Sequence, residues 1–254
     1  GLDTARWFAG AGIRILEGYG LTETSPVLAI NTPNANRMGS VGRPLPNVEW
    51  RFAEDGELLV RGPNVFSGYW KHERPADPAD PSAPFDAEGW FRTGDIGHID
   101  ADGFLSITDR KKELLKTSGG KLIAPQPIEN KLKTSYLVAH AALVGDRHKF
   151  ASALIVPNFA ALEPWARERG IAADSRQELA EHPQVRLQYQ VLVEQVNTTL
   201  ANFETIKRFR LVAEEWGIES GELTPSLKLR RRIIHQKYAA VIAEFYADEA
   251  TAQR

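Results

Sequence analysis

The first 108 residues alternate apolar and polar positions in short runs, with the two-residue period of β-strands. Two pairs of such runs flank Asp-Gly dipeptides, at 48–52 and 57–61 and at 98–100 and 104–107. An Asp-Gly step between alternating runs is typical of a β-hairpin. A shorter apolar run at 11–16 predicts a strand that leads into a glycine-rich loop. We therefore expect residues 1–108 to be β-rich and barrel-like.

The pattern changes after Asp109, where charged residues become dense and strand-length apolar runs alternate with helical periodicity. Helices are predicted at 126–135, 159–202 and 226–247, and strands at 138–144, 150–156 and 208–213. Ser175 is a suitable N-terminal cap within the long helical region, because its hydroxyl can accept a backbone N–H. The expected fold class is α+β, in which a small mixed α/β domain at 109–254 follows the β-rich region.

Composition excludes several classes of protein. The 254 residues contain 31 Lys and Arg against 33 Asp and Glu, so no basic surplus supports non-specific nucleic-acid binding. Cysteine is absent, which excludes disulfides and thiolate chemistry. No apolar run approaches the roughly 20 residues of a membrane helix and no leader-like segment is evident, so we expect a cytoplasmic location. Peripheral membrane contact is left open, and no obligate protein partner is indicated.

The first candidate chemistry lies at residues 18–24, Gly-Tyr-Gly-Leu-Thr-Glu-Thr. Glycines let a ligand approach the backbone, and a tyrosine ring can stack on a flat base. A threonine hydroxyl can bind a phosphate oxygen, and a carboxylate can hold Mg²⁺. A tight turn with a capping threonine and a solvated glutamate is an equally good interpretation of this segment alone.

Three further segments carry polar groups in suggestive patterns, at 89–95, 108–121 and 223–232. In the first, Asp95 has the chemistry to accept hydrogen bonds from two ribose hydroxyls, although stabilising a turn is the more ordinary role. The second combines cations with paired glycines but lacks P-loop spacing, and a solvated charged hairpin accounts for it equally. The third is a basic segment around Lys228 that is typical of a helix start with an exposed basic face.

Taken in order, these segments resemble the C-terminal part of the acyl-adenylate-forming superfamily. The matching pieces lie at 18–23, 56–62, 89–95 and 109–113 and at Lys228 after Thr224-Pro225, and they span nearly the whole chain. Within the superfamily, the Thr-Ser-Gly-Gly-Lys at 117–121 and the helical region 159–202 look most like long-chain fatty acyl-CoA synthetases. The resemblance implies that ATP and a fatty acid give an acyl-adenylate and pyrophosphate, and that CoA then displaces AMP.

The resemblance also assigns roles to the residues of the first motif. Tyr19, flanked by Gly18 and Gly20, would stack on adenine. Thr22 would contact the phosphate, and Glu23 would hold Mg²⁺. ATP, Mg²⁺ and CoA are therefore the ligands that we expect the whole enzyme to use.

Later residues are assigned in the same way. Asp95 and Arg110 would bind the ribose hydroxyls, and Asp109 would be the hinge on which the domain 109–254 rotates. Lys228 would bridge carboxylate and phosphate oxygens during adenylation, stabilising charge that develops in the transition state. Rotation would then remove Lys228 and bring the 112–121 segment toward the site for thioester formation. The CoA side would be lined by Lys116 and Gly119.

One departure from the superfamily pattern limits these implications. The Ser/Thr/Gly-rich phosphate loop and its lysine lie upstream of the Tyr-Gly-Leu-Thr-Glu motif in the superfamily and are absent here. The chain begins at Gly1 and has one methionine, Met38, so we expect a fragment that has no ligase activity of its own. Two alternatives stay open: a fatty acyl-AMP ligase that loads a carrier protein, and a non-catalytic module that acts through a basic helix at 226–237.

Overall fold

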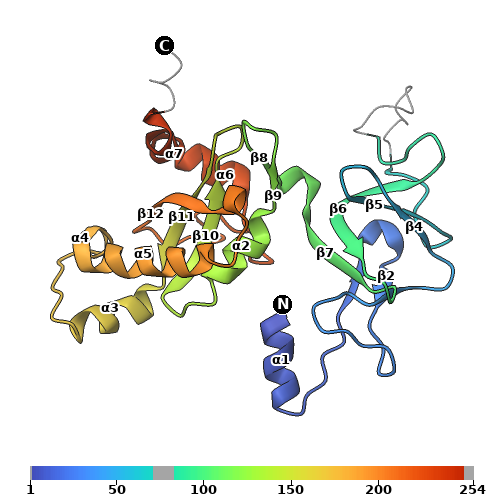
Figure 1. Ribbon diagram of the computed structural model, residues 1–254, viewed down its shortest axis with the longest axis horizontal. Helices are drawn as coiled ribbons and strands as arrows, with labels where there is room; N and C mark the ends of the chain where they lie inside the picture. The colour runs from blue at the N-terminus through green and yellow to red at the C-terminus, as the bar shows by residue number, and fades with distance from the viewer. Residues whose placement is uncertain (1, 71–82, 249–254) are drawn as a thin grey trace. The chain divides into compact units, whose positions relative to one another are not determined.

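The computed structural model describes residues 2–70 and 83–248 (Figure 1). The chain divides into two compact units, Gly1–Lys112 and Glu113–Arg254. Each unit contains its own buried apolar core. Asp109, where the sequence places the boundary, lies inside a strand of the first unit shortly before this division.

The first unit contains two antiparallel sheets after a short helix, α1 (Leu2–Gly10). One sheet has the order β1 (Gly18–Gly20), β2 (Val27–Ile30), β3 (Arg43–Pro44). The other has the order β4 (Glu49–Phe52), β5 (Glu57–Arg61), β6 (Phe91–Ile99), β7 (Leu105–Arg110). A 3₁₀ turn, η1 (Thr22–Thr24), lies between β1 and β2. Buried side chains of both sheets, including Leu28, Leu58 and Phe91, form one shared core.

Both predicted hairpins are present, as β4–β5 and β6–β7. Gly56 and Gly103 adopt φ angles of 82° and 83° in their turns, a conformation that glycine adopts without strain. The four-stranded sheet is open, because β4 and β7 are its two edges and do not pair with each other in residues 2–70 and 83–248. The expectation of a barrel-like region is therefore not confirmed.

The strand predicted at 11–16 is wrong. These residues follow α1 without regular structure, and Ile13 is half exposed to solvent. Strand β1 is formed instead by the glycine-flanked residues that were expected to be a loop. A Cβ atom on Gly20 would lie 1.7 Å from the Pro26 carbonyl oxygen, so a glycine is needed where the β1–β2 register shifts.

The second unit is built on a three-stranded sheet of order β10 (Val138–Val144), β11 (Ala151–Pro157), β12 (Ile206–Leu211). Strand β10 is antiparallel to β11, and β12 is parallel to it. Strand β11 is buried along its whole length, as expected for a strand with helices on both faces. The hairpin β8 (Leu115–Lys116), β9 (Leu122–Ile123) precedes the sheet, and 3₁₀ turns lie at η2 (Lys111–Glu113) and η3 (Asn202–Glu204).

Two groups of helices cover the sheet of the second unit (Figure 1). One face packs against α2 (Pro125–Leu132), α3 (Phe159–Arg167), α4 (Arg176–Glu181) and α5 (Pro183–Asn197). The other face packs against α6 (Arg231–Lys237) and α7 (Ala239–Phe245). Alternate residues of β11 contribute to the two apolar clusters, with Ile155 in the first and Leu154 in the second. This is the two-residue period of a doubly covered strand.

Most elements predicted for this region are confirmed, but two helical predictions are wrong in part. The region 159–202 contains three helices, and Ser175 caps α4 by accepting the Glu178 N–H at 3.1 Å. The predicted helix at 226–247 starts only at Arg231 and is broken at Tyr238. Leu227 has a φ of 58°, which no helix accommodates. Within the described residues no helix is both long and apolar enough to cross a bilayer.

Candidate functional site

Three residues predicted to serve the nucleotide, Tyr19, Asp95 and Arg110, meet in the first unit. The Tyr19 hydroxyl donates to Asp95 Oδ2 at 2.6 Å, and Arg110 Nε lies 3.0 Å from Asp95 Oδ1. Asp95 and Arg110 are cross-strand partners on β6 and β7, so the pairing of the hairpin itself brings them together. Burial and the Asp95 carboxylate both raise the pKa of Tyr19, which keeps its hydroxyl protonated as a donor.

A bulge in β6 directs Asp95 toward Tyr19. The β5–β6 register shifts between the pairs Glu57–Ile96 and Leu59–Arg92, so β6 carries extra residues at 93–95. Gly94 lies in this bulge with a φ of 69°. The Thr93 hydroxyl donates to the Leu58 carbonyl at 2.7 Å and accepts the Asp95 N–H at 3.1 Å. The Thr-Gly-Asp sequence therefore supplies both the geometry of the bulge and the carboxylate that it presents.

The position of Asp95 restricts how it can bind a ribose. Its side chain is only 3% exposed, and the Tyr19 and Arg110 contacts occupy both of its oxygens. The Arg110 side chain is 54% exposed, so it is the group that can move aside. In this structure Asp95 orients Tyr19 and Arg110.

Glu57 is a site residue that the sequence analysis missed. It is buried, and its carboxylate accepts the Gly94 N–H at 3.0 Å and Lys111 Nζ at 2.7 Å. Lys111 also pairs with Asp55 at 2.6 Å. Because Lys111 follows Arg110 directly, Glu57 connects the bulge to the end of β7. Glu57 lies on the face of β5 opposite Leu58 and Val60, and no local pattern in the sequence marks it.

The rest of the first motif lies at the turn between β1 and β2. Thr22 is exposed, and Glu23 is half-buried with its Oε1 accepting the Tyr69 hydroxyl at 2.8 Å. One accessible carboxylate suits Mg²⁺, which is usually held by one or two carboxylates together with waters and substrate phosphates. The buried Thr24, to which no role was assigned, closes the turn by accepting the Leu21 N–H at 2.9 Å.

Asp109 and the residues after it connect the two units. Asp109 is 1% exposed within β7, and its carboxylate accepts the N–H of Arg110 at 2.6 Å. A residue held in this way is fixed to the sheet of the first unit. The division of the chain follows Lys112, after the contact between Lys111 and Glu57.

Lys116 and Gly119 belong to the β8–β9 hairpin of the second unit. The hairpin is fastened to the turn between β10 and β11: the Lys116 N–H donates to Asp146 at 3.0 Å, and the Ser118 N–H donates to the His148 carbonyl at 2.8 Å. Lys116 is exposed at the end of β8, and Gly119 is exposed in the turn that joins β8 to β9. The hairpin thus presents a lysine and a bare glycine backbone on a well-anchored loop.

Lys228 lies on a closed loop, whereas the sequence placed it within a helix. The Thr224 N–H donates to the Lys228 carbonyl at 2.8 Å, and the Lys228 N–H donates to the Thr224 hydroxyl at 3.1 Å. Leu227, directly before the lysine, has left-handed backbone geometry. Residues held in such strained conformations cluster at functional sites. The loop leaves the Lys228 side chain exposed.

A buried ion-pair cluster supports this loop from behind. Arg231 donates to both carboxylate oxygens of Glu129, at 2.7 and 2.9 Å, and its Nε donates to Glu113 at 3.0 Å. The Arg231 and Glu129 side chains are 15% and 5% exposed. Arg231 therefore does not belong to an exposed basic face, which weakens the hypothesis of an interaction module at 226–237.

Comparison with known proteins agrees with this assembly of motifs. Residues 1–70 match the model of the AMP-binding enzyme family, and residues 112–250 match that of the AMP-binding enzyme C-terminal domain. The chain is thus shown to belong to the AMP-binding enzyme family, the acyl-adenylate-forming superfamily indicated by its motifs.

Individual curated relatives show which AMP-binding enzymes this chain is similar to. The chain is 41% identical over 250 residues to a long-chain-fatty-acid–CoA ligase, FadD15, of Mycobacterium bovis, covering 98% of this chain and 41% of the relative. It is 32% identical over 276 residues to the long-chain-fatty-acid–CoA ligase ACSBG1 of Bos taurus, covering 99% and 37%. The chain thus spans about two fifths of the length of these relatives.

A solved relative shares the fold. O-succinylbenzoate coenzyme A synthetase of Bacillus subtilis, determined in complex with ATP and a magnesium ion, matches with a TM-score of 0.65 and 25% identity. The match covers 91% of this chain and 43% of that structure. The mixed α/β architecture described above is therefore that of an adenylate-forming enzyme.

Proposed function

We propose that this chain is the C-terminal part of an ATP-dependent long-chain fatty acid–CoA ligase. The observation that carries the proposal is the Tyr19–Asp95–Arg110 cluster, which joins three separate family motifs in one place. The names of the curated relatives supply the substrate class. A cluster that presents an aromatic ring beside a guanidinium and a carboxylate suits a nucleoside.

Adenylation in this proposal uses residues of both units. Tyr19 stacks on adenine, and its bond to Asp95 fixes the ring in one orientation. Arg110 and Asp95 bind the ribose hydroxyls after the Arg110 side chain moves. Thr22 contacts phosphate, and Lys228 stabilises the charge that develops as the carboxylate attacks the α-phosphorus.

Glu23 is the residue that would hold Mg²⁺. Its accessible carboxylate provides the hard oxygen donor that the ion prefers. When bound, the ion neutralises charge on the phosphates of ATP. The hydrogen bond from Tyr69 orients the same carboxylate.

Thioester formation requires a different set of groups. In the proposal the second unit rotates about the segment that follows Asp109, so that Lys228 leaves the site and the β8–β9 hairpin approaches it. Lys116 and Gly119 then line the path of the CoA thiol. One site cannot suit two differently charged transition states equally, so exchanging one face of a domain for another separates the two steps.

The proposal is tested in the full-length enzyme that carries this chain. Lys228→Ala should abolish fatty-acid-dependent ATP–pyrophosphate exchange while leaving the attack of CoA on pre-formed acyl-adenylate intact. Arg232→Ala, which removes an exposed neighbouring cation, is the matched control and should alter neither step. An equal loss of both steps in Lys228→Ala would contradict the role given to this lysine.

Two further measurements bear on the alternatives. The isolated 254-residue chain should show no pyrophosphate exchange, because it lacks the phosphate loop of the family; measurable exchange would refute this. In the full-length enzyme, transfer of the acyl group to free CoA supports the ligase, whereas transfer only to the phosphopantetheine arm of a carrier protein would assign it to the carrier-loading class.

A further inference from the structure

Strand β12 presents an open edge. It is the last strand in the order β10–β11–β12, and no other strand pairs with its outer side within residues 2–70 and 83–248. The Asn197 side chain bonds to both backbone groups of Ile206, at 2.8 and 2.9 Å, and thereby covers the beginning of this edge. Beyond Ile206 the strand borders a groove. An open strand edge is a template for pairing with another extended chain.

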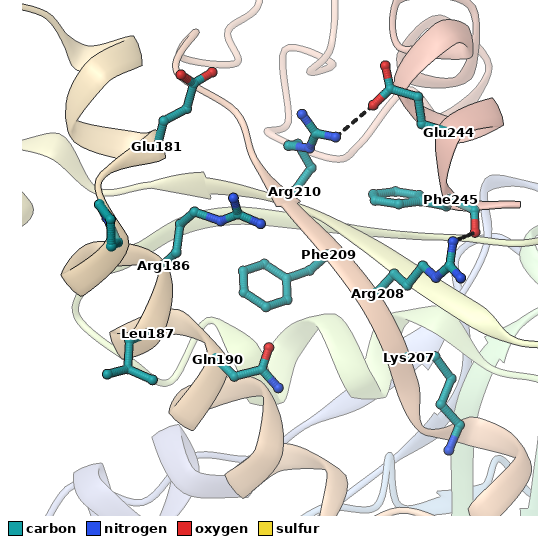
Figure 2. Close-up of a pocket in the computed structure, with 11 residues that line it drawn as sticks. Glu181, Arg186, Leu187, Gln190, Lys207, Arg208, Phe209, Arg210, Glu244 and Phe245 are labelled. Carbon is teal, nitrogen blue, oxygen red and sulfur yellow. Dashed lines mark hydrogen bonds and ion pairs between the residues drawn. The ribbon is translucent and has the colours of Figure 1, made fainter. Parts of the chain in front are cut away.

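The groove beside β12 has a volume of about 660 Å³ and lies between α5 and α7. We call it the β12 groove; the residues that matter here are Arg186, Leu187, Lys207, Arg208, Phe209 and Arg210. Figure 2 shows Arg186 reaching from α5 toward the strand, with the Phe209 ring lying between the helix and β12. A second cavity of about 270 Å³ shares Arg186, Phe209 and Arg210 and extends the groove to Leu211. The concave surface therefore follows the strand.

The groove carries a positive surplus. Its four cations, Arg186, Lys207, Arg208 and Arg210, outnumber its carboxylates, Glu181 and Glu244. Arg210 pairs with Glu244 at 2.6 Å and Arg208 with Asp248 at 2.7 Å, but both carboxylates are more than half exposed. Exposed pairs of this kind are weak and can be exchanged for another anion. Arg186 and Lys207 make no ion pair with any residue of the described part of the chain.

Successive side chains of β12 lie on opposite faces of the sheet, and this alternation specifies the sequence pattern of a strand that could pair with it. Phe209 packs against the cluster on the α5 side, whereas Arg208 and Arg210 reach α7 residues. In a strand added to β12, each residue would share a face with the residue directly opposite. The position opposite Phe209 would therefore be apolar, and the positions opposite Arg208 and Arg210 acidic.

We propose that the β12 groove is a docking site for an extended acidic segment of a partner protein, which adds to the sheet as a strand with an acidic–apolar–acidic pattern. Backbone hydrogen bonds to the edge would provide affinity, and the four cations would provide selectivity. The same cations oppose pairing with a second copy, because two Lys-Arg-Phe-Arg edges would repel each other. A small anion would bind the cations but would form no backbone hydrogen bonds with the strand edge.

A labelled peptide, Gly-Glu-Val-Glu-Val-Glu-Gly, tests this proposal by fluorescence anisotropy with the full chain. We expect saturable binding that weakens at least about tenfold in the double variant Arg208→Glu, Arg210→Glu, because the two cations opposite the peptide's glutamates become repulsive. The control variant Arg167→Glu reverses an exposed cation on α3, outside the groove, and should bind like the unmodified chain. Circular dichroism shows whether each variant is folded.

A second peptide separates strand addition from charge alone. Replacing both valines by proline keeps the charge but removes two backbone N–H donors, and this peptide should bind at least about tenfold more weakly. Amide exchange of residues 207–211 should slow only with the valine peptide. Equal binding of the two peptides, equal binding by the double variant, no binding at all, or peptide-blocked self-association of the chain would each overturn the proposal.

Discussion

The Tyr19 hydroxyl donates a 2.6 Å hydrogen bond to the buried Asp95 carboxylate, joining β1 to the bulge of β6. A charged oxygen buried to this degree needs its donors. The contact therefore has two consequences: it orients the aromatic ring, and it compensates for the burial of Asp95. These two consequences are separable by substitution.

Tyr19→Phe keeps the ring and removes the donor. We expect the free energy of unfolding to fall by about 1–3 kcal/mol, since the buried Asp95 carboxylate loses the Tyr19 donor. Urea denaturation of the chain measures this change. In the full-length enzyme, nucleotide affinity should decrease less in Tyr19→Phe than in Tyr19→Ala, which also removes the ring. Equal affinities of the two variants would contradict stacking.

Glu57→Gln tests the connection between the bulge and the segment that leads to the second unit. The amide can still accept the Gly94 N–H but no longer carries the charge that holds Lys111. We expect the stability of the first unit to fall by about 1–3 kcal/mol and amide exchange at residues 110–112 to become faster. Glu49→Gln removes an exposed carboxylate paired with Arg61 and is the control. If exchange at 110–112 is unchanged, Glu57 does not anchor this segment.

Breaking the buried pair of Arg231 and Glu129 should be costly. Arg231→Met leaves the Glu129 carboxylate buried without its guanidinium, although it still accepts the Leu143 N–H, and we expect the free energy of unfolding to fall by about 3–5 kcal/mol. Arg232→Met changes the exposed neighbouring residue, and its free energy of unfolding should stay within about 0.5 kcal/mol of that of the unmodified chain. Thermal or urea unfolding distinguishes the two. Similar values for both variants would show that the cluster contributes little.

Stability should fall as the solution becomes acidic below neutral pH. Burial lowers the pKa of His235 below its ordinary value of 6.5, and the nearby Arg231 lowers it further. A folded-state pKa below the unfolded one means that the unfolded chain takes up the proton first, so stability present above about pH 6.5 declines as pH falls toward the folded-state pKa. In urea titrations at a series of pH values, His235→Asn should make the free energy of unfolding depend less on pH between about pH 7.5 and pH 5.5. An unchanged pH dependence would exclude His235 as its source.

Two glycines with similar backbone angles should respond differently to alanine. Gly42 and Gly89 have φ angles of 91° and 83°. A Cβ on Gly42 would lie 1.9 Å from the Ile30 backbone, whereas a Cβ on Gly89 would meet nothing within 4 Å. Gly89→Ala should therefore cost only the strain of about 1–2 kcal/mol, and Gly42→Ala should cost more or prevent folding of the first unit. Comparable melting temperatures would contradict this.

The sequence predicted elements best where a local period or turn signal decides the structure. Asp-Gly steps with alternating flanks marked the two hairpins, and Ser175 marked a helix start because capping is local. The apolar run at 11–16 misled because hydrophobicity alone cannot distinguish a strand from an irregular segment. Likewise, an amphipathic pattern at 226–247 concealed the left-handed Leu227.

The site was accessible to sequence reasoning only through family resemblance. Tyr19, Asp95 and Arg110 are far apart in the chain, and what joins them is a register shift and a cross-strand pair. No local pattern reports such a relationship. Glu57 was missed for a similar reason: its partners are a bulge amide and a lysine that lie close only after the sheet has formed.

The parallel pairing of β11 and β12 has a consequence for how the second unit folds. The two strands are neighbours in the sheet, yet residues 158–205 with three helices separate them along the chain. Until that crossover closes, β11, which is buried along its whole length in the folded protein, has backbone hydrogen-bonding groups without a partner on one side. Pairings between sequence-distant strands form slowly. Arrival of β12 is thus expected to limit the folding rate, and the chain is most vulnerable to aggregation just before it.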